Sequence, residues 1–385
     1  MKFIHTSDWH LGRTLANYPL QRFQEQFLDH FVDLVAHERP DAVLLAGDVF
    51  DRAIAPQSAM VLLEHTLRQL AELTQVVMIS GNHDAPVRLG YGSSLYTDRV
   101  RVFIRCAQVG TPVSFGDVHV YPVPFLEPDE ARFELAPSLD EPLPRTHDDV
   151  MAAALRRIDA DLSARGGVGI AMVHAFVAGS KTSESERDIA VGGSQASYPE
   201  TFARMGSHAP CSQLAYVAAG HLHRAQQLQA GGTPIRYCGT PLPYSFSEAN
   251  YAHSTTIVTV TGKDVSIRTV PVPQPYQLVN LRGSLQEVLN QPVVSNAFYS
   301  IELTDPIRPE RAYEQVKNRF ETALVVRHTG TVPVDHAPQR RNLDPTDLVA
   351  AFFETTLDRN LSASERGLVR NTWEQVRKEE HNASA

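Results

Sequence analysis

The chain has 385 residues, of which 43% are hydrophobic and 21% are charged. This length exceeds one ordinary domain and the composition is typical of a folded globular protein, so we predict two domains with an appendage and exclude overall disorder. The formal net charge of -9 neither supports nor excludes a nucleic-acid partner, because the acidic residues 127–150 contribute most of it.

The start of the chain and its cysteines indicate a compartment. Met1 leads directly into strand-like sequence without an apolar signal peptide, and no apolar run is long enough to cross a bilayer. Cys106, Cys211 and Cys238 are scattered, lack CxxC spacing and are expected to be buried reduced thiols. We therefore expect a cytoplasmic protein without a membrane attachment.

The first half of the chain alternates short apolar runs with helical patterns. Apolar residues spaced three and four apart predict a helix across residues 23–34, and a second helix is predicted from Gln57 to Leu73. Residues 127–150 contain several prolines among their acids and are predicted to be an irregular loop, before a helix at 150–162. Further strands are predicted at residues 42–46, 76–79, 168–173 and 216–219. This alternation is typical of an α/β fold around a buried sheet.

The second half changes character twice. Residues 231–272 have glycine-rich turns and β-branched segments typical of an antiparallel sheet edge. The prolines that follow place a domain boundary at residue 275, so the predicted domains are 1–275, a small α+β domain at 276–338 and a helical segment at 339–385. The two amphipathic helices of the last segment either fold back on the body or dock a partner.

Five apolar runs end in residues that bind metal ions. The five ends are Ser7-Asp8-Trp9-His10, Gly47-Asp48, Gly81-Asn82-His83-Asp84, Val173-His174 and Gly220-His221-Leu222-His223. Since sites in α/β sheets assemble at the carboxyl ends of strands, these five ends are predicted to meet at one place. Each pattern alone is weak evidence, apart from the rare Gly-Asn-His-Asp, but their joint occurrence disfavours turn residues and core histidines.

The donor atoms in these ends indicate which ions they suit. Aspartate, histidine and asparagine without a thiolate favour manganese, iron or zinc over calcium. The set is large enough for two ions if the central Asp48 bridges them. Two ions about 3.5 to 4 Å apart can clamp the attacking and leaving oxygens of a phosphoryl centre, so we predict two divalent ions and phosphoester hydrolysis.

These motifs, together with the run Gly47-Asp48-Val49-Phe50-Asp51, resemble the calcineurin-like metallophosphoesterase superfamily over residues 1–275. The resemblance implies a β-sandwich flanked by helices. It also implies one ion held by Asp8, His10, Asp48 and His223, and a second held by Asp48, Asn82, His174 and His221.

The resemblance implies further roles beside the ions. His83 would contact the scissile phosphate and protonate the leaving oxygen, and Asp84 would orient its ring. Asp51 would either accept a hydrogen bond from a ligand histidine or cap the next helix, and we favour the cap. Arginines in or near the motif loops are candidate phosphate contacts, although each is alternatively a solvated surface residue: Arg13, Arg52, Arg88, Arg187 and Arg236. The polar loop 178–188 is a candidate wall of the cleft.

Within the superfamily, the chain is similar to DNA nucleases that act with an SbcC-type coiled-coil ATPase. That similarity implies manganese-dependent exonuclease and endonuclease activity on DNA ends and hairpins in repair and recombination. It also implies a homodimer within a heterotetramer, a capping domain at 276–338 that positions DNA, and ATPase docking by the helices of 339–385. Two alternatives are a stand-alone phosphomonoesterase or cyclic nucleotide phosphodiesterase, and a mainly structural scaffold for the ATPase.

Overall fold

The computed structural model describes residues 1–96, 98–138, 140–182, 196–207, 212–330, 344–357 and 360–383. Its chain forms two compact units. The first comprises residues 1–303 and 310–328, and the second comprises residues 304–309 with the described residues from 329 onwards. Among the described residues, no helix combines the length and apolar character needed to span a bilayer.

The first unit contains two six-stranded sheets. One has the order β14-β13-β1-β4-β5-β6, with β1 Lys2–Thr6, β4 Ala42–Ala46, β5 Gln75–Ile79, β6 Val100–Phe103, β13 Ser254–Thr261 and β14 Asp264–Pro271. The other has the order β11-β12-β10-β9-β8-β7, with β7 Val113–Phe115, β8 Val118–Val123, β9 Val168–His174, β10 Leu214–Gly220, β11 Gln226–Ala230 and β12 Thr233–Tyr237. Strands β1, β4, β5 and β6 run parallel, as do β8, β9, β10 and β12.

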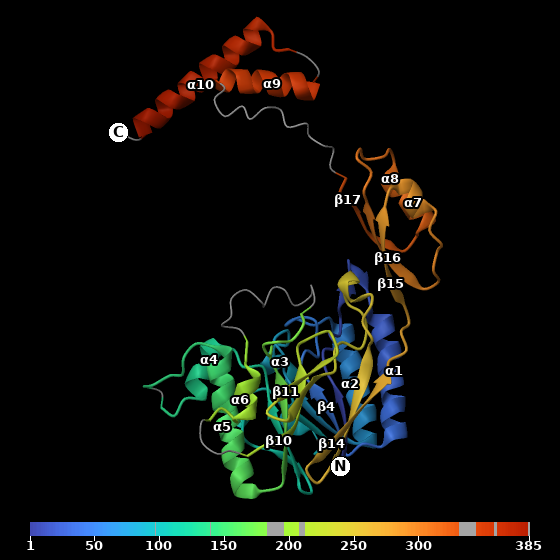
Figure 1. Ribbon diagram of the computed structural model, residues 1–385, viewed down its shortest axis with the longest axis vertical. Coiled ribbons are helices and arrows are strands. Elements are labelled where there is room, and N and C mark those ends of the chain that lie inside the picture. Colours follow the sequence, from blue (N-terminus) through green and yellow to red (C-terminus); the bar gives the residue numbers. More distant parts are fainter. Residues whose placement is uncertain are drawn as a thin grey trace. The chain divides into compact units, whose positions relative to one another are not determined.

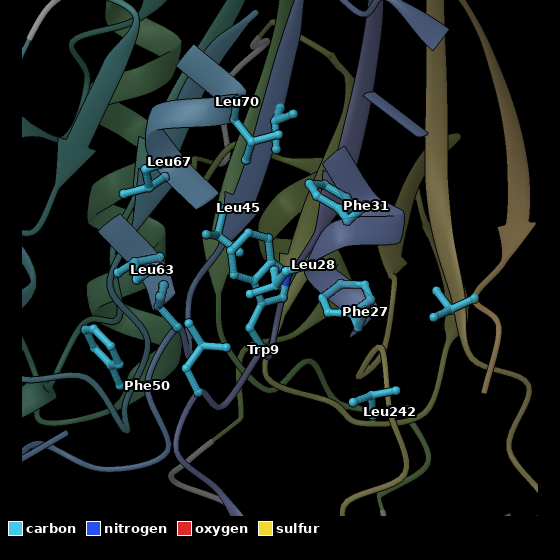
Figure 2. Packing of buried hydrophobic residues seen from close by; sticks show 14 of the residues in the cluster. Trp9, Phe27, Leu28, Phe31, Leu45, Phe50, Leu63, Leu67, Leu70 and Leu242 are labelled. Atoms are coloured by element: carbon cyan, nitrogen blue, oxygen red, sulfur yellow. The ribbon is translucent and has the colours of Figure 1, made fainter. Parts of the chain in front are cut away.

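Three apolar layers hold the sheets and helices together. Residues such as Leu44 and Met172, one from each sheet, share the core between the sheets. Helices α1 Gln21–Glu38 and α2 Gln57–Leu73 pack on the first sheet, whereas α5 His147–Arg165 and α6 Pro199–Ala203 pack on the second (Figure 1). Figure 2 shows Trp9 in the first of these outer layers, where its ring meets Phe27 and Phe31 of α1 edge to face. The predicted α/β sandwich flanked by helices is therefore confirmed.

The loop predicted at residues 127–150 is partly wrong, because it contains helix α4 Pro128–Glu134 and the first turn of α5. Proline in the first turn of α4 has no N–H to leave unpaired, and Asp129 and Glu130 there interact favourably with the helix dipole. Thr146 caps α5 by accepting a hydrogen bond from the backbone N–H of Asp149. Proline and acids thus mark helix starts here. The prediction also missed β6, β7, β8 and β11, the hairpin of β2 Thr14–Leu15 and β3 Tyr18–Pro19, and α3 Pro86–Leu89.

Residues 277–328 form a small sheet of their own. The elements are β15 Gln277–Gly283, α7 Leu285–Leu289, β16 Ala297–Leu303, α8 Ala312–Arg319 and β17 Ala323–His328. The three strands run parallel in the order β15-β16-β17, so helices alternate with strands instead of being segregated as in an α+β unit. Leu278 and Phe298 of this sheet belong to the same apolar cluster as Tyr276 and the α1 residue Phe27, so packing crosses the predicted boundary at residue 275.

The second unit contains the two predicted terminal helices, α9 Pro345–Leu357 and α10 Ala363–Ala383, which contact each other. A capping box starts α10: the Ser362 backbone N–H donates to Glu365 Oε2 at 2.8 Å, and the Glu365 N–H donates to Ser362 Oγ at 3.3 Å. Asp344 likewise accepts from the Thr346 N–H at 2.8 Å, as expected of a residue that starts a helix.

Candidate dinuclear metal centre

The carboxyl ends of β1, β4, β5, β9 and β10, with the loops that follow them, bring the seven predicted ligands together: Asp8, His10, Asp48, Asn82, His174, His221 and His223. Six of the seven are buried and Asn82 is half-buried. Donor atoms of Asp8, Asp48 and His174 lie within 4.8 Å of one another, as do those of His10, Asp48 and His83. The predicted meeting of the five strand ends is thus observed.

Backbone strain is concentrated at these residues. Asp8, His10, Asp48 and His221 have φ angles of 55°, 45°, 50° and 111°, which non-glycine residues rarely adopt. Hydrogen bonds between the loops stabilise this conformation: the Asp8 N–H donates to the Gly47 carbonyl and the His10 N–H to the Asp48 carbonyl, both at 3.0 Å. Strained residues that cluster in this way are typical of functional sites.

Two glycines of the motifs are required by close packing. A Cβ atom on Gly81 would lie 2.1 Å from Asp48 Oδ1, and one on Gly47 would lie 2.4 Å from His174 Nδ1. Both contacts are with atoms of the site and not with flexible side-chain ends. The glycines in Gly-Asp and Gly-Asn-His-Asp therefore allow the loops to approach one another.

The donor atoms form two groups that share one carboxylate oxygen. His10 Nε2 lies 3.2 Å from His223 Nε2 and 3.7 Å from Asp48 Oδ2. In the second group, Asn82 Oδ1 lies 3.0 Å from both His174 Nε2 and His221 Nδ1, and His174 Nε2 lies 3.5 Å from Asp48 Oδ2. Ligand atoms on one ion with bonds of about 2.1 Å stand about 3.0 to 3.4 Å apart. The separations of 3.2 and 3.0 Å within the two groups lie in this range, whereas those to Asp48 Oδ2, at 3.7 and 3.5 Å, are slightly longer, so each group is close to the geometry of one divalent ion.

Hydrogen bonds on the far side of two rings set their orientation. His174 Nδ1 lies 2.8 Å from the Ala46 carbonyl oxygen, and His223 Nδ1 lies 2.8 Å from Glu248 Oε1. Because both partners accept hydrogen bonds, Nδ1 carries a proton, which leaves Nε2 as the ring atom that would bind an ion. Neither Ala46 nor Glu248 was predicted: a carbonyl has no side-chain signal, and Glu248 lies outside the five motifs.

The electrostatics of the protein groups favour a cation at this place. Burial raises the pKa of Asp8 to about 6, against the attraction of His174. Burial alone would also raise the pKa of Asp48, but its attraction to His174 and His10 holds that pKa well below the ordinary value. Burial lowers the pKa of His221 to about 3, which keeps its ring neutral as a metal ligand must be.

His83 sits beside the first donor group. Its backbone N–H donates to Asp48 Oδ1 at 2.9 Å, and its ring meets the His10 ring edge to face with 4.8 Å between centroids. The ring Nδ1 lies 2.8 Å from the backbone carbonyl oxygen of Asp51. The half-buried imidazole is therefore held at the edge of the centre, as a proton donor to a leaving group requires.

The roles expected of Asp84 and Asp51 are corrected. Both carboxylate oxygens of Asp84 accept backbone N–H groups, with Oδ2 2.8 Å from Gly81 N and Oδ1 2.9 Å from Phe50 N. Asp84 therefore joins two loops, and the backbone carbonyl of Asp51 holds the His83 ring instead. Asp51 does not cap α2, which begins at Gln57 after Pro56. Its carboxylate instead lies 2.8 Å from Arg13 Nη1 and 3.8 Å from His10 Nδ1.

The candidate phosphate contacts differ in exposure. Arg13 is paired with Asp51, and its guanidinium lies 5.6 Å from the centroid of the Tyr244 ring. Arg52 and Arg88 are exposed, whereas Arg236 is half-buried in β12. Arg187 and residues 183–188 of the candidate wall lie outside the described residues, as does Cys211. Cys238 is buried and Cys106 is half-buried.

A family model and several known proteins match the chain. Residues 1–225 match the family model described as calcineurin-like phosphoesterase. The chain is 34% identical over 326 residues to the SbcD component of the nuclease SbcCD from Bacillus subtilis (strain 168), with 79% of each chain covered. Among solved structures, a dimetal phosphatase from Danio rerio matches 71% of this chain and 99% of its own with 14% identity and a TM-score of 0.44. The TT1561 protein of Thermus thermophilus matches 70% of this chain and 98% of its own with 15% identity and a TM-score of 0.40.

Proposed function

Because the chain belongs to the calcineurin-like phosphoesterase family and is similar to the SbcD component of the SbcCD nuclease, we propose that it hydrolyses DNA phosphodiester bonds with two divalent ions. The observation that carries the proposal is the sharing of Asp48 Oδ2 between two donor groups. Nitrogen and oxygen donors without a thiolate are compatible with manganese as the ion, as they are with iron or zinc.

Two bound ions would polarise the phosphoryl oxygens and supply a nucleophile at neutral pH. The chain itself arranges the rest of the reaction. Asp48 sets the separation of the two donor groups, and the buried neutral rings of His10 and His221 keep their lone pairs available. His83, held by the Asp51 carbonyl, donates a proton to the leaving oxygen of the cleaved strand.

The family relationship supports an SbcC-type ATPase as the partner, since the relative's name makes it part of an SbcCD assembly. Residues 339–385 would dock that ATPase. Leu348 and Phe352 of α9 and Leu368 and Trp373 of α10 are exposed apolar side chains suited to a coiled-coil surface. Residues 1–275 would be the nuclease domain, and residues 276–338 would cap it and position DNA over the ions.

A homodimer within the complex is supported by an apolar groove between α2 and the segment that follows α3. Met60 and Val61 of α2 and Tyr91 and Leu95 line this groove and are more than half exposed. A large exposed apolar patch of this kind is typical of a protein interface. We place the complex in the cytoplasm, where DNA repair and recombination would use it.

The testing experiment combines the purified chain, manganese or magnesium, and DNA with blunt, blocked or hairpin ends, with and without the ATPase and ATP. We expect manganese-dependent cleavage that the substitutions Asp8→Asn and His83→Leu each strongly reduce. If the chain instead hydrolyses nitrophenyl phosphate rapidly and leaves single-stranded circular DNA uncut, it is a phosphomonoesterase. Unchanged cleavage by complexes that carry either substitution would contradict the mechanism.

A further inference from the structure

A buried carboxylate outside the five motifs contacts one half of the centre. Glu248 ends a short 3-10 helix, Phe246–Glu248, in the connection between β12 and β13, and its side chain is 0% exposed. We propose that Glu248 is a positioning residue that fixes the His223 ring and strengthens ion binding at the His10–His223 half of the centre alone. This inference rests on the proposed two-ion function.

Local structure fixes the carboxylate at both ends. The Glu248 backbone N–H donates to the Ser245 carbonyl at 2.9 Å, and the Ser245 hydroxyl caps the turn by accepting from the Ser247 N–H at 3.1 Å. At the other end, Glu248 Oε2 accepts the Tyr244 N–H at 2.7 Å, which leaves Oε1 facing the His223 ring. The side chain therefore has one orientation in which to hold the imidazole.

The two halves of the centre differ in what supports their histidines. His223 Nδ1 donates to a carboxylate, whereas His174 Nδ1 donates to the neutral carbonyl of Ala46, both at 2.8 Å. A negative partner makes the opposite ring nitrogen a stronger electron donor to an ion than a neutral partner does. The supported atom, His223 Nε2, lies 3.2 Å from His10 Nε2. The effect of Glu248 is thus directed at one ion.

Burial provides a second, independent argument. A fully buried carboxylate is costly unless a positive charge or several hydrogen bonds compensate it. An ion bound between His10 and His223 places positive charge directly beyond the ring that Glu248 contacts. The hydrogen bonds from Tyr244 and His223 offset part of the cost of burying this charge, and a bound ion would offset more of it.

The test is a manganese titration of the full chain, with free ion measured by electron paramagnetic resonance. Parent protein, Glu248→Gln and the control Glu38→Gln are compared. Glu38 is a carboxylate with a 12% exposed side chain, and it pairs with Lys2 at the opposite end of β1 from the centre. We expect Glu248→Gln to keep one ion at the parent affinity and to bind the other about 10- to 100-fold more weakly, and the control to bind both as the parent does.

If Glu248→Gln folds, two results would overturn the proposed role of Glu248. The variant would either bind both ions at the parent affinity or bind both ions equally more weakly. A parent chain that binds a single ion would instead overturn the proposed function, and the two failures are thereby distinct. If circular dichroism shows that Glu248→Gln does not fold, Glu248→Asp replaces it, because its shorter side chain withdraws the charge from His223 Nδ1. Two ions at parent affinity in that variant would overturn the proposal. Absorption of bound cobalt gives a further readout, since only the ion at His223 should change its spectrum.

Discussion

The substitution Gly81→Ala tests whether the centre depends on close packing of the motif loops. The added Cβ would lie 2.1 Å from Asp48 Oδ1 and 2.3 Å from the Asp48 backbone nitrogen. Ordinary contact starts at 3.4 Å, so the first of these distances falls short by about 1.3 Å. Since backbone and a buried side chain are both involved, the Asp48 carboxylate has to move.

Movement of the Asp48 carboxylate should weaken catalysis, stability and manganese binding. Asp48 Oδ1 accepts the His83 N–H at 2.9 Å, so displacement affects the position of the proton donor as well as that of the shared ligand. Misplacement of about 1 Å lowers rates about 100-fold, and overpacking costs about 1 to 3 kcal/mol of stability. We expect losses of this size in kcat/KM for a phosphodiester substrate and in urea unfolding, together with reduced manganese binding.

The control is Gly90→Ala, where the added Cβ would lie 2.4 Å from Ile104 Cδ1, the flexible end of a side chain. This variant should retain manganese and activity. Two ions bound at the parent affinity by Gly81→Ala, with activity within about threefold of the parent, would refute the packing argument, because a misplacement of about 1 Å should cost far more.

Three further predictions concern single properties. His83→Leu should retain both ions by metal analysis but lose about 100- to 10,000-fold in single-turnover cleavage, and loss of an ion would contradict its role as proton donor. Hydrogen bonding from Arg268 lowers the pKa of Glu38 below 4.5, so its stabilisation is present above that pH and is lost as pH falls through the folded-state pKa. Glu38→Gln should therefore lower the unfolding free energy by up to about 1 kcal/mol at pH 7, and this difference should shrink as the pH falls below 4.5 and through the folded-state pKa. A difference that does not change with pH would contradict the pairing. Chelation should lower Tm because the ions bind the folded state, and the loss should shrink as manganese is added back; a Tm insensitive to manganese would contradict tight binding.

The sequence predicts the site loops and the strands that precede them well, because apolar runs followed by polar ligand residues are local patterns. Helix α2 has the predicted bounds, Gln57 to Leu73, and the strand ends that carry Asp48 and His174 lie together as expected. The acidic segment was misinterpreted, since proline and acidic residues occur both in loops and in first turns of helices.

The contacts that support the ligands could not be predicted from sequence. The Ala46 carbonyl that holds His174 is 128 residues distant in the chain and has no side-chain signature. Glu248 lies in a turn whose sequence gives no indication of burial, and Asp84 follows His83 directly although its oxygens face the backbone of other loops. These roles depend on the direction of a side chain after folding, which residue spacing does not determine.

The central claim is that one carboxylate, Asp48, is shared by two ions. The most direct measurement is manganese content per chain for Asp48→Ala beside His10→Ala and Asn82→Ala, after equal loading. The account predicts that Asp48→Ala loses both ions, whereas each of the other variants loses mainly one. Equal manganese content in Asp48→Ala and the parent protein would contradict it.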